Sequence, residues 1–225
     1  DGSIRFATDC SAIWNSQSIA QAGSMNWRPA NGSPMPDLGV VILAGGEGRR
    51  IGGLKPDRIF RGERLIDIAI DKARAWSPIV LISVRTVGQV RTAAGEQLLD
   101  RQDIEGPLGG LIAALERAEA LCLSHVVTLP CDMPLVPADM AERLFDTSRR
   151  EARAAVAGSG GRLHPVCAVW PVACLADILE YASAGRRSLA GALEVCQAVE
   201  VWWTGSEGDP FENINTLSDL RRLSE

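Results

Sequence analysis

Residues 43–56 read LAGGEGRRIGGLKP and continue the apolar run Val40–Leu43. The glycines lack a Cβ atom, so backbone N–H groups can approach phosphate oxygens closely, and the loop can adopt positive φ where a nest of donors requires it. Arg49, Arg50 and Lys55 add positive charge. Arginine forms bidentate contacts with phosphate, whereas lysine is a compact charge suited to a moving phosphoryl oxygen. The stretch therefore predicts a loop that binds the phosphates of a nucleoside triphosphate.

Two common glycine-rich loops do not fit this stretch. A Walker loop needs Lys-Ser or Lys-Thr directly after its last glycine, whereas Gly53 is followed by Leu54-Lys55-Pro56. A dinucleotide-binding loop needs a third glycine where Ile51 stands, and an acidic residue closing the second strand, which runs into Arg85. A simple strand-to-helix turn is the remaining alternative, but three clustered cations exceed what such a turn requires.

Length, composition and net charge limit the kinds of protein that this sequence can form. The 225 residues suffice for one sizeable domain, and 46% hydrophobic with 5% aromatic residues favours an aliphatic core. The net charge of −5 argues against binding to nucleic acid or anionic membranes. No apolar run approaches the roughly 20 residues that span a bilayer. The six cysteines form no Cys-x-x-Cys pair, which favours reduced, buried thiols over disulfides or a zinc site. We therefore expect a cytoplasmic protein.

Residues 1–37 are rich in Ser, Asn, Gln, Gly and Pro without an apolar period, so we expect a tail or linker there and one folded domain over residues 38–225. In that domain, short apolar runs alternate with helical patterns. This predicts a three-layer α/β fold, a mostly parallel twisted sheet with helices on both faces. The first three strands are expected at Val40–Leu43, Ile79–Val84 and Val126–Leu129. The other expected elements are helices near 65–76, 108–121, 138–149 and 172–182, strands at 154–157, 166–170 and 199–203, and a final helix from Leu217.

Ligands of such sheets bind outside the carboxyl ends of the strands. The glycine loop lies there, Ser83 and Arg85 end the second strand, and Asp132 follows the third strand between two prolines. A carboxylate held rigidly opposite a phosphate loop predicts a Mg²⁺ ligand, because Mg²⁺ takes one or two carboxylates and shares its other positions with phosphate and water. The alternative is that Asp132 caps the next helix or forms the turn ahead of it, although Asp139 is nearer to the start of that helix.

Three acidic residues, Asp100, Asp103 and Glu105, precede the turn Gly106–Gly110. A carboxylate here either accepts hydrogen bonds from the N1 and N2 donors of guanine or favours the helix N-terminus electrostatically. The sequence leaves both interpretations open.

Two segments near the end of the chain carry further candidates. His164 stands before Pro165 and an expected strand, where it can contact a phosphate or a pterin. Asn213 and Asn215 are two residues apart, so their amides share a face if the segment is extended. Thr216 could instead serve as the cap of the last helix.

In combination, these motifs resemble those of the molybdenum cofactor guanylyltransferases, which join GMP from GTP to molybdopterin. The resemblance covers about residues 40–223 and implies a Rossmann-like nucleotidyltransferase fold. Two positions depart from the family pattern: Leu54 stands where an aspartate usually precedes the loop lysine, and Ser83 stands where an asparagine is common. The motifs are LAGG with downstream Arg50, Gly52, Gly53 and Lys55, GPL at 106–108, PCDMP at 130–134, His164-Pro165 and NINT at 213–216.

The resemblance implies roles for the matching residues. Lys55, Arg50 and Asp132 would be catalytic, and Asp132 would bind Mg²⁺, the expected cofactor. His164, Asn213 and Asn215 would form the molybdopterin side. The expected partners are GTP, molybdopterin and molybdoenzyme maturation proteins, with no nucleic acid and no membrane. The nucleotide would be bound by Leu43, Ala44, Gly45, Gly46, Gly53, Lys55, Ser83, Asp100 and Asp132.

The residues also fit the chemistry directly. A phosphate oxygen of the acceptor attacks the α-phosphorus in line and pyrophosphate leaves, while Lys55 and Mg²⁺ on Asp132 stabilise the growing charge. A phosphate nucleophile is already ionised, so no general base is required. The alternatives are the same chemistry with CTP or with a sugar or polyol phosphate acceptor, and a non-catalytic nucleotide-binding module of the same fold.

Overall fold

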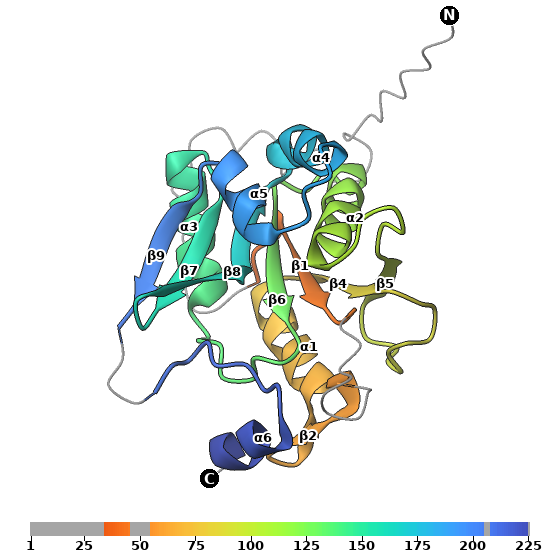
Figure 1. The fold of residues 1–225 in the computed structure, drawn as a ribbon, viewed down its shortest axis with the longest axis vertical. Helices are drawn as coiled ribbons and strands as arrows, with labels where there is room; N and C mark the ends of the chain where they lie inside the picture. Colours follow the sequence, from red (N-terminus) through yellow and green to blue (C-terminus); the bar gives the residue numbers. More distant parts are fainter. Residues whose placement is uncertain (1–33, 46–54, 205–207, 225) are drawn as a thin grey trace, which may run out of the picture.

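The computed structural model describes residues 34–45, 55–204 and 208–224 (Figure 1). Its centre is a seven-stranded sheet in the order β5-β4-β1-β6-β8-β7-β9, and β2 pairs with β3 in a separate two-stranded sheet. The strands are β1 (Leu38–Leu43), β2 (Ile59–Phe60), β3 (Glu63–Arg64), β4 (Ile79–Val84), β5 (Glu96–Leu99), β6 (His125–Pro130), β7 (Ala155–Ser159), β8 (Arg162–Pro171) and β9 (Val199–Trp203). The α-helices are α1 (Leu65–Trp76), α2 (Pro107–Ala120), α3 (Met140–Glu151), α4 (Leu175–Ser183), α5 (Leu189–Val195) and α6 (Leu217–Ser224), with short 3₁₀ helices η3 (Lys55–Asp57) and η4 (Val172–Cys174).

The strand directions confirm a mostly parallel sheet. Strand β1 pairs in parallel with β4 and β6, and β4 pairs in parallel with β5. Strand β8 runs antiparallel to β6 and β7, and β9 is again parallel to β7. The carboxyl ends of β5, β4, β1 and β6 therefore meet at one edge of the sheet.

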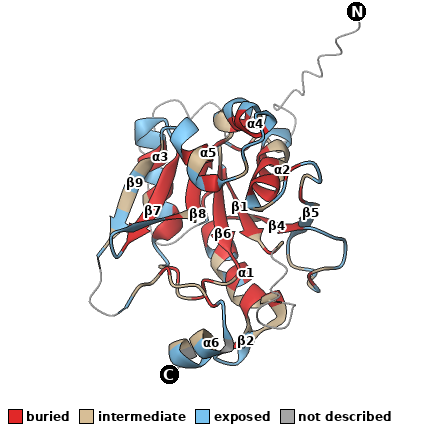
Figure 2. Ribbon diagram, in the orientation of Figure 1, coloured by how far each residue is buried: buried red, intermediate tan, exposed pale blue. Residues whose placement is uncertain are grey.

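Helices cover both faces of the sheet, which gives the predicted three layers. Side chains alternate across a strand: Val40 and Ile42 of β1 belong to a core formed with α1 and α3, whereas Val41 belongs to a core formed with α2, α4 and α5. Figure 2 shows the central strands and the inward faces of these helices as buried. Burial on both faces explains why β1 is a continuous apolar run.

The predicted elements are confirmed, and the sequence missed mainly short ones. Helix α1 coincides with the prediction, but the edge strand β5 and the seven-residue helix α5 were not expected. Strand β8 begins earlier than predicted, so His164 lies within it rather than before it. The register between β7 and β8 shifts at Val156/Ala157. Such an irregularity accommodates a residue like Pro165, which lacks the N–H that a regular ladder uses.

The last residues of the predicted tail contact the domain. Met35 is buried, and its N–H donates to the carbonyl of Trp76 at 2.8 Å. The carbonyl of Asp37 accepts from the N–H of Ser124 at 3.0 Å. Residues 1–33 lie outside the described residues.

Two expectations from composition have different outcomes. Of the helices that the structure describes, none has the length and apolar character needed to cross a bilayer. The expectation of reduced thiols is confirmed for Cys131, Cys167, Cys174 and Cys196 and is wrong for Cys122, which is disulfide-bonded. A disulfide requires two Cα atoms within about 7 Å, and sequence spacing does not determine that distance.

Leu111 of α2 provides a test of the core. Its side chain is fully buried, whereas Leu99 at the end of β5 is 50% exposed. We expect Leu111→Ala to lower the free energy of unfolding by about 2–5 kcal/mol, through lost burial and an unfilled cavity. The matched change Leu99→Ala should cost no more than about 0.5 kcal/mol. Urea denaturation followed by circular dichroism measures both; equal losses would contradict this assignment of the core.

Candidate active site

Three segments distant in sequence meet at one lysine. Lys55, the first residue of η3, donates from Nζ to the carboxylate of Asp132 and to Oδ1 of Asn215, the latter at 2.9 Å. The side chains of Lys55 and Asp132 are 15% and 16% exposed. Water therefore screens this ion pair incompletely. The structure brings together the predicted phosphate-binding lysine, the predicted metal ligand and one of the two predicted asparagines.

Backbone hydrogen bonds hold Asp132 at the sheet edge. It follows β6, where the N–H of Cys131 donates to the carbonyl of Leu43 at the end of β1 at 3.5 Å. Its own carbonyl accepts from the N–H of Ile214 at 2.8 Å, and Ile214 is itself buried. Helix α3 begins at Met140 after Asp139. Asp132 as the cap of that helix is therefore wrong, because the start of the helix lies further along the chain. Asp132 does lie in a turn ahead of the helix, as the other form of that alternative expected.

The donor set suits Mg²⁺ shared with a substrate. Within the described residues, no group of three or more His, Cys, Asp or Glu side chains could hold a metal on its own. Asp132 would supply one hard carboxylate ligand, and a cation such as Mg²⁺ commonly binds one or two protein carboxylates with phosphate and water in its other positions. The chemistry of this residue therefore fits a divalent cation shared with a phosphate-bearing substrate.

A second polar cluster lies on the other side of β1. Ser83, the residue before the end of β4, donates from Oγ to Oδ1 of Asp100 at 2.5 Å. Asp100 is 8% exposed. Burial is the largest effect and raises the pKa of its carboxyl, opposed by the Ser83 hydrogen bond and the positive charge of Arg85. Because Oδ1 of Asp100 accepts the hydrogen bond from Ser83, Oδ2 is the oxygen that this bond leaves free for another donor.

Glycine is required where the backbone approaches this cluster. A Cβ on Gly45 would lie 2.7 Å from Oδ2 of Asp100, and one on Gly110 would lie 2.2 Å from Oγ of Ser83. Both distances are far below van der Waals contact. Gly45 was predicted from the loop, whereas Gly110 of α2 was named only as part of a permissive turn. The run of glycines after Pro107 was the sequence signal for it.

A cavity of about 660 Å³ opens beside Asp100, a volume within the range of small-molecule sites. Glu105 lines it, whereas Asp103 is not among the lining residues and forms two hydrogen bonds with Arg101, both 3.0 Å. Sequence analysis missed Arg187, which comes from the connection between α4 and α5 and carried no motif. The lining residues are Arg85, Asp100, Arg101, Gln102, Ile104, Glu105, Gly106 and Arg187.

The structure describes the first residues of the predicted loop, Leu43 to Gly45. Ala44 is buried; its N–H donates to the carbonyl of Ser83 at 3.1 Å, and its carbonyl accepts from Nε2 of Gln89 at 3.1 Å. Leu43 is half-buried at the end of β1. The predicted residues Gly46, Arg50 and Gly53 lie outside the described residues.

His164 forms part of a buried hydrogen-bonded chain. It is 5% exposed, and its Nε2 lies 2.7 Å from Oγ of Ser159, which donates to Oδ1 of Asp209 at 2.5 Å. Because the hydroxyl proton of Ser159 goes to Asp209, Nε2 of His164 must carry the proton that it donates to Ser159. Burial lowers the pKa of His164, opposed by the negative charge of Asp209, and so favours the neutral ring. Asp209 also accepts from the N–H of Phe211 at 2.9 Å.

The hydrogen bonds from His164 through Ser159 to Asp209 fix the segment that carries the two asparagines. The ring of His164 stacks on Phe211 with centroids 4.8 Å apart, and Phe211 is fully buried two residues before Asn213. Asn213 is half-buried and Asn215 is exposed. His164 therefore contacts the asparagine segment through Phe211. Ser159 and Asp209 gave no sequence signal, since neither belongs to a local motif, whereas Phe211 adjoins the NINT motif.

Comparisons with known proteins agree on one family. Residues 40–198 match the model of the MobA-like NTP transferase domain. The chain is 35% identical over 184 residues to the molybdenum cofactor guanylyltransferase of Cereibacter sphaeroides, covering 81% of this chain and 93% of the relative. It is 37% identical to the protein of the same name from Acidiphilium cryptum, covering 81% and 92%.

Solved structures lead to the same group. Molybdopterin-guanine dinucleotide biosynthesis protein A of Archaeoglobus fulgidus superposes with a TM-score of 0.67 at 25% identity, covering 82% of this chain and 96% of that one. The family-model match and the relatives above 30% identity both extend over most of the chain. The chain therefore belongs to the MobA-like molybdenum cofactor guanylyltransferase family.

Proposed function

We propose that this protein transfers GMP from GTP to the phosphate of molybdopterin, forming the guanine dinucleotide cofactor and pyrophosphate. The observation that carries the proposal is the meeting of Lys55, Asp132 and Asn215 on one side of β1, with the Asp100 cavity on the other. A nucleotide bound across β1 has its base in the cavity and its phosphates near Lys55. This direction agrees with binding at the carboxyl ends of parallel strands.

The reaction joins two phosphates, and the protein must above all stabilise the negative charge that grows in the transition state. An oxygen of the acceptor phosphate attacks the α-phosphorus, the bond to the bridging oxygen breaks, and pyrophosphate leaves with the electron pair. Lys55 donates to the phosphate oxygens on which charge grows. Asp132 is the residue that would hold Mg²⁺, which when bound screens the triphosphate and acts as a Lewis acid. The acceptor phosphate is already ionised, so no side chain needs to remove a proton.

Lys55 and Asp132 form an ion pair. Each neutralises the other, which lowers the cost of holding two partly buried charges. Asn215 accepts from Lys55 through Oδ1, while its Nδ2 group offers donors to an acceptor phosphate. Asn215 thereby connects the lysine to the side of the site proposed for molybdopterin.

The residues that line the cavity beside Asp100 support the choice of guanine as the base. Asp100 and Glu105 are acceptors that suit the N1 and N2 donors of guanine. Cytosine presents an acceptor at N3 where guanine presents a donor, so the same carboxylates disfavour it. The proposal also includes a cytoplasmic location and transfer of the product to molybdoenzyme maturation proteins.

Nucleotide selectivity can be measured by thermal shift with Mg²⁺ and GTP or CTP. We expect GTP to raise the melting midpoint more than CTP, because Asp100 and Glu105 suit the N1 and N2 donors of guanine. The possible size of the effect is large, since a ligand at 100 times its Kd stabilises the native state by about 2.7 kcal/mol. Asp100→Asn should reduce the advantage of GTP, and Asp71→Asn on the exposed surface of α1 should preserve it. A larger shift with CTP would support the cytidylyl alternative.

Catalysis can be measured as pyrophosphate release from GTP, Mg²⁺ and molybdopterin. We expect Lys55→Ala and Asp132→Asn each to lower kcat about 10²–10³-fold, the usual effect of losing one transition-state contact. Asp139→Asn is the matched control, because Asp139 is an exposed acceptor for Trp203 and should leave kcat unchanged. A folded Asp132→Asn protein with the parental rate would remove Asp132 from the mechanism. No release from the parent would favour the non-catalytic binding module.

A further inference from the structure

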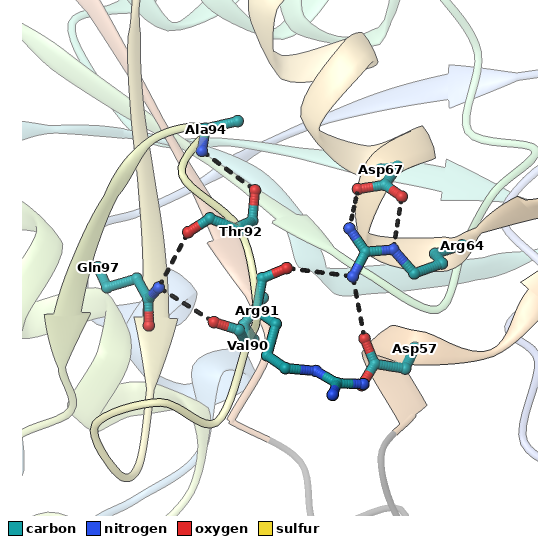
Figure 3. Close-up of polar contacts among 8 residues, drawn as sticks. All are labelled: Asp57, Arg64, Asp67, Val90, Arg91, Thr92, Ala94 and Gln97. Atoms are coloured by element: carbon teal, nitrogen blue, oxygen red, sulfur yellow. Dashed lines mark hydrogen bonds and ion pairs between the residues drawn. The ribbon is translucent and has the colours of Figure 1, made fainter.

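Arg64, the residue before helix α1, joins three parts of the molecule through one guanidinium group. It donates to both carboxylate oxygens of Asp67 at 2.6 and 2.7 Å, to Oδ1 of Asp57 at 3.2 Å and to the carbonyl of Arg91 at 3.1 Å. Figure 3 shows Asp57, Asp67 and the Arg91 carbonyl arranged around this group. Its planar fork allows all these contacts at once, which the single ammonium of a lysine does not.

The acceptor at Arg91 is held by the core. Arg91 lies in the connection between β4 and β5, next to Val90, which is 2% exposed and packs with the helix α1 core. Gln97 of β5 donates from Nε2 to the carbonyl of Val90 at 3.1 Å, and Oγ1 of Thr92 accepts from the N–H of Ala94 at 3.1 Å (Figure 3). The connection therefore offers Arg64 a fixed acceptor.

Asp57 connects the Arg64 contacts to Lys55. Both residues belong to η3, which has three residues and a buried Pro56. A helix this short has little stability of its own, because helix nucleation is costly. Asp57 also pairs with Arg91 at 3.5 Å, but Arg91 is 81% exposed and Arg64 is 31% exposed. Water screens the Arg91 pair more strongly, so Arg64 is the main anchor of Asp57.

We propose that Arg64 is a positioning residue, which through Asp57 holds η3 so that the ammonium of Lys55 reaches Asp132 and Asn215. The inference rests on the proposed function for its effect on turnover, but not for its effect on the geometry of Lys55. Small displacements of a catalytic group are costly, since an error of about 1 Å can lower a rate about 10²-fold.

The lysine content of the chain permits a direct test. The sequence contains two lysines, Lys55 and Lys72. Protein labelled with ¹³C at lysine Cε therefore gives two lysine side-chain signals in an NMR spectrum. Lys72 is an internal reference, because its Nζ donates to the carbonyl of Val136 at 2.9 Å, away from the Arg64 contacts. We expect Asp57→Asn to move the Lys55 signal and leave that of Lys72 in place.

Turnover is measured on the same proteins. We expect Asp57→Asn to lower kcat at least about 10-fold, with a smaller change in the KM for GTP, and Arg64→Lys to have an intermediate effect. Combined with Lys55→Ala, Asp57→Asn should cause no further loss, because it acts through Lys55. The matched control is Glu96→Gln, which removes a carboxylate from the exposed pair with Arg117 at 2.9 Å and should change neither signal nor kcat.

Each outcome bears on one claim. An unmoved Lys55 signal in Asp57→Asn and Arg64→Lys, or a multiplicative loss in the double variant, overturns the positioning role. A moved Lys55 signal with unchanged kcat supports the positioning role and instead contradicts Lys55 as a catalytic residue. If Asp57→Asn does not fold, as judged by circular dichroism, Arg64→Lys with the same two measurements decides the matter.

Discussion

Strand β1 is the constraint on which the site depends. It lies between β4 and β6 in a parallel register, with both of its faces buried. A strand in this position cannot shift by one residue without moving its apolar side chains to the wrong layer. The loop after β1 therefore leaves the sheet at a fixed point, between the cavity beside Asp100 and the ion pair of Lys55 with Asp132. Everything proposed for the nucleotide follows from that order of strands.

The two sides of the site use polar groups differently. On the side proposed for the base, Ser83 and Asp100 are buried against glycine backbone and joined by a hydrogen bond. On the side proposed for the phosphates, Lys55 and Asp132 form an ion pair that is partly exposed. A buried cluster of this kind suits the recognition proposed for a base, whereas a partly exposed pair of charges suits the proposed binding and release of a triphosphate.

Contacts outside the site hold two segments that contribute to it against the rest of the domain. The Arg64 contacts fix η3 against the connection between β4 and β5, and the chain from His164 through Ser159 to Asp209 fixes the segment after β9. Both arrangements combine a buried anchor, Val90 in one and Phe211 in the other, with charged or polar groups nearer the surface. The lysine and the asparagine that meet at the site are thus each held by contacts outside it.

Local patterns in the sequence predict the central strands, helix α1 and a phosphate-binding loop. These features are local: continuous apolar runs, a helical period and a glycine-rich stretch with cations all act over a few residues. Ser83 and Asp132 were found because the ends of the predicted strands are themselves local signals. Asp100 was singled out only as a carboxylate before the glycine turn, because strand β5 was not expected. Other features follow from tertiary contacts alone: Ser83 binds Asp100, Arg187 lines the cavity, and His164 lies inside β8 against Phe211. The Arg64 contacts likewise depend on the tertiary structure. Their partners are brought together by strand order and helix packing, and no spacing along the chain encodes which distant side chains will meet.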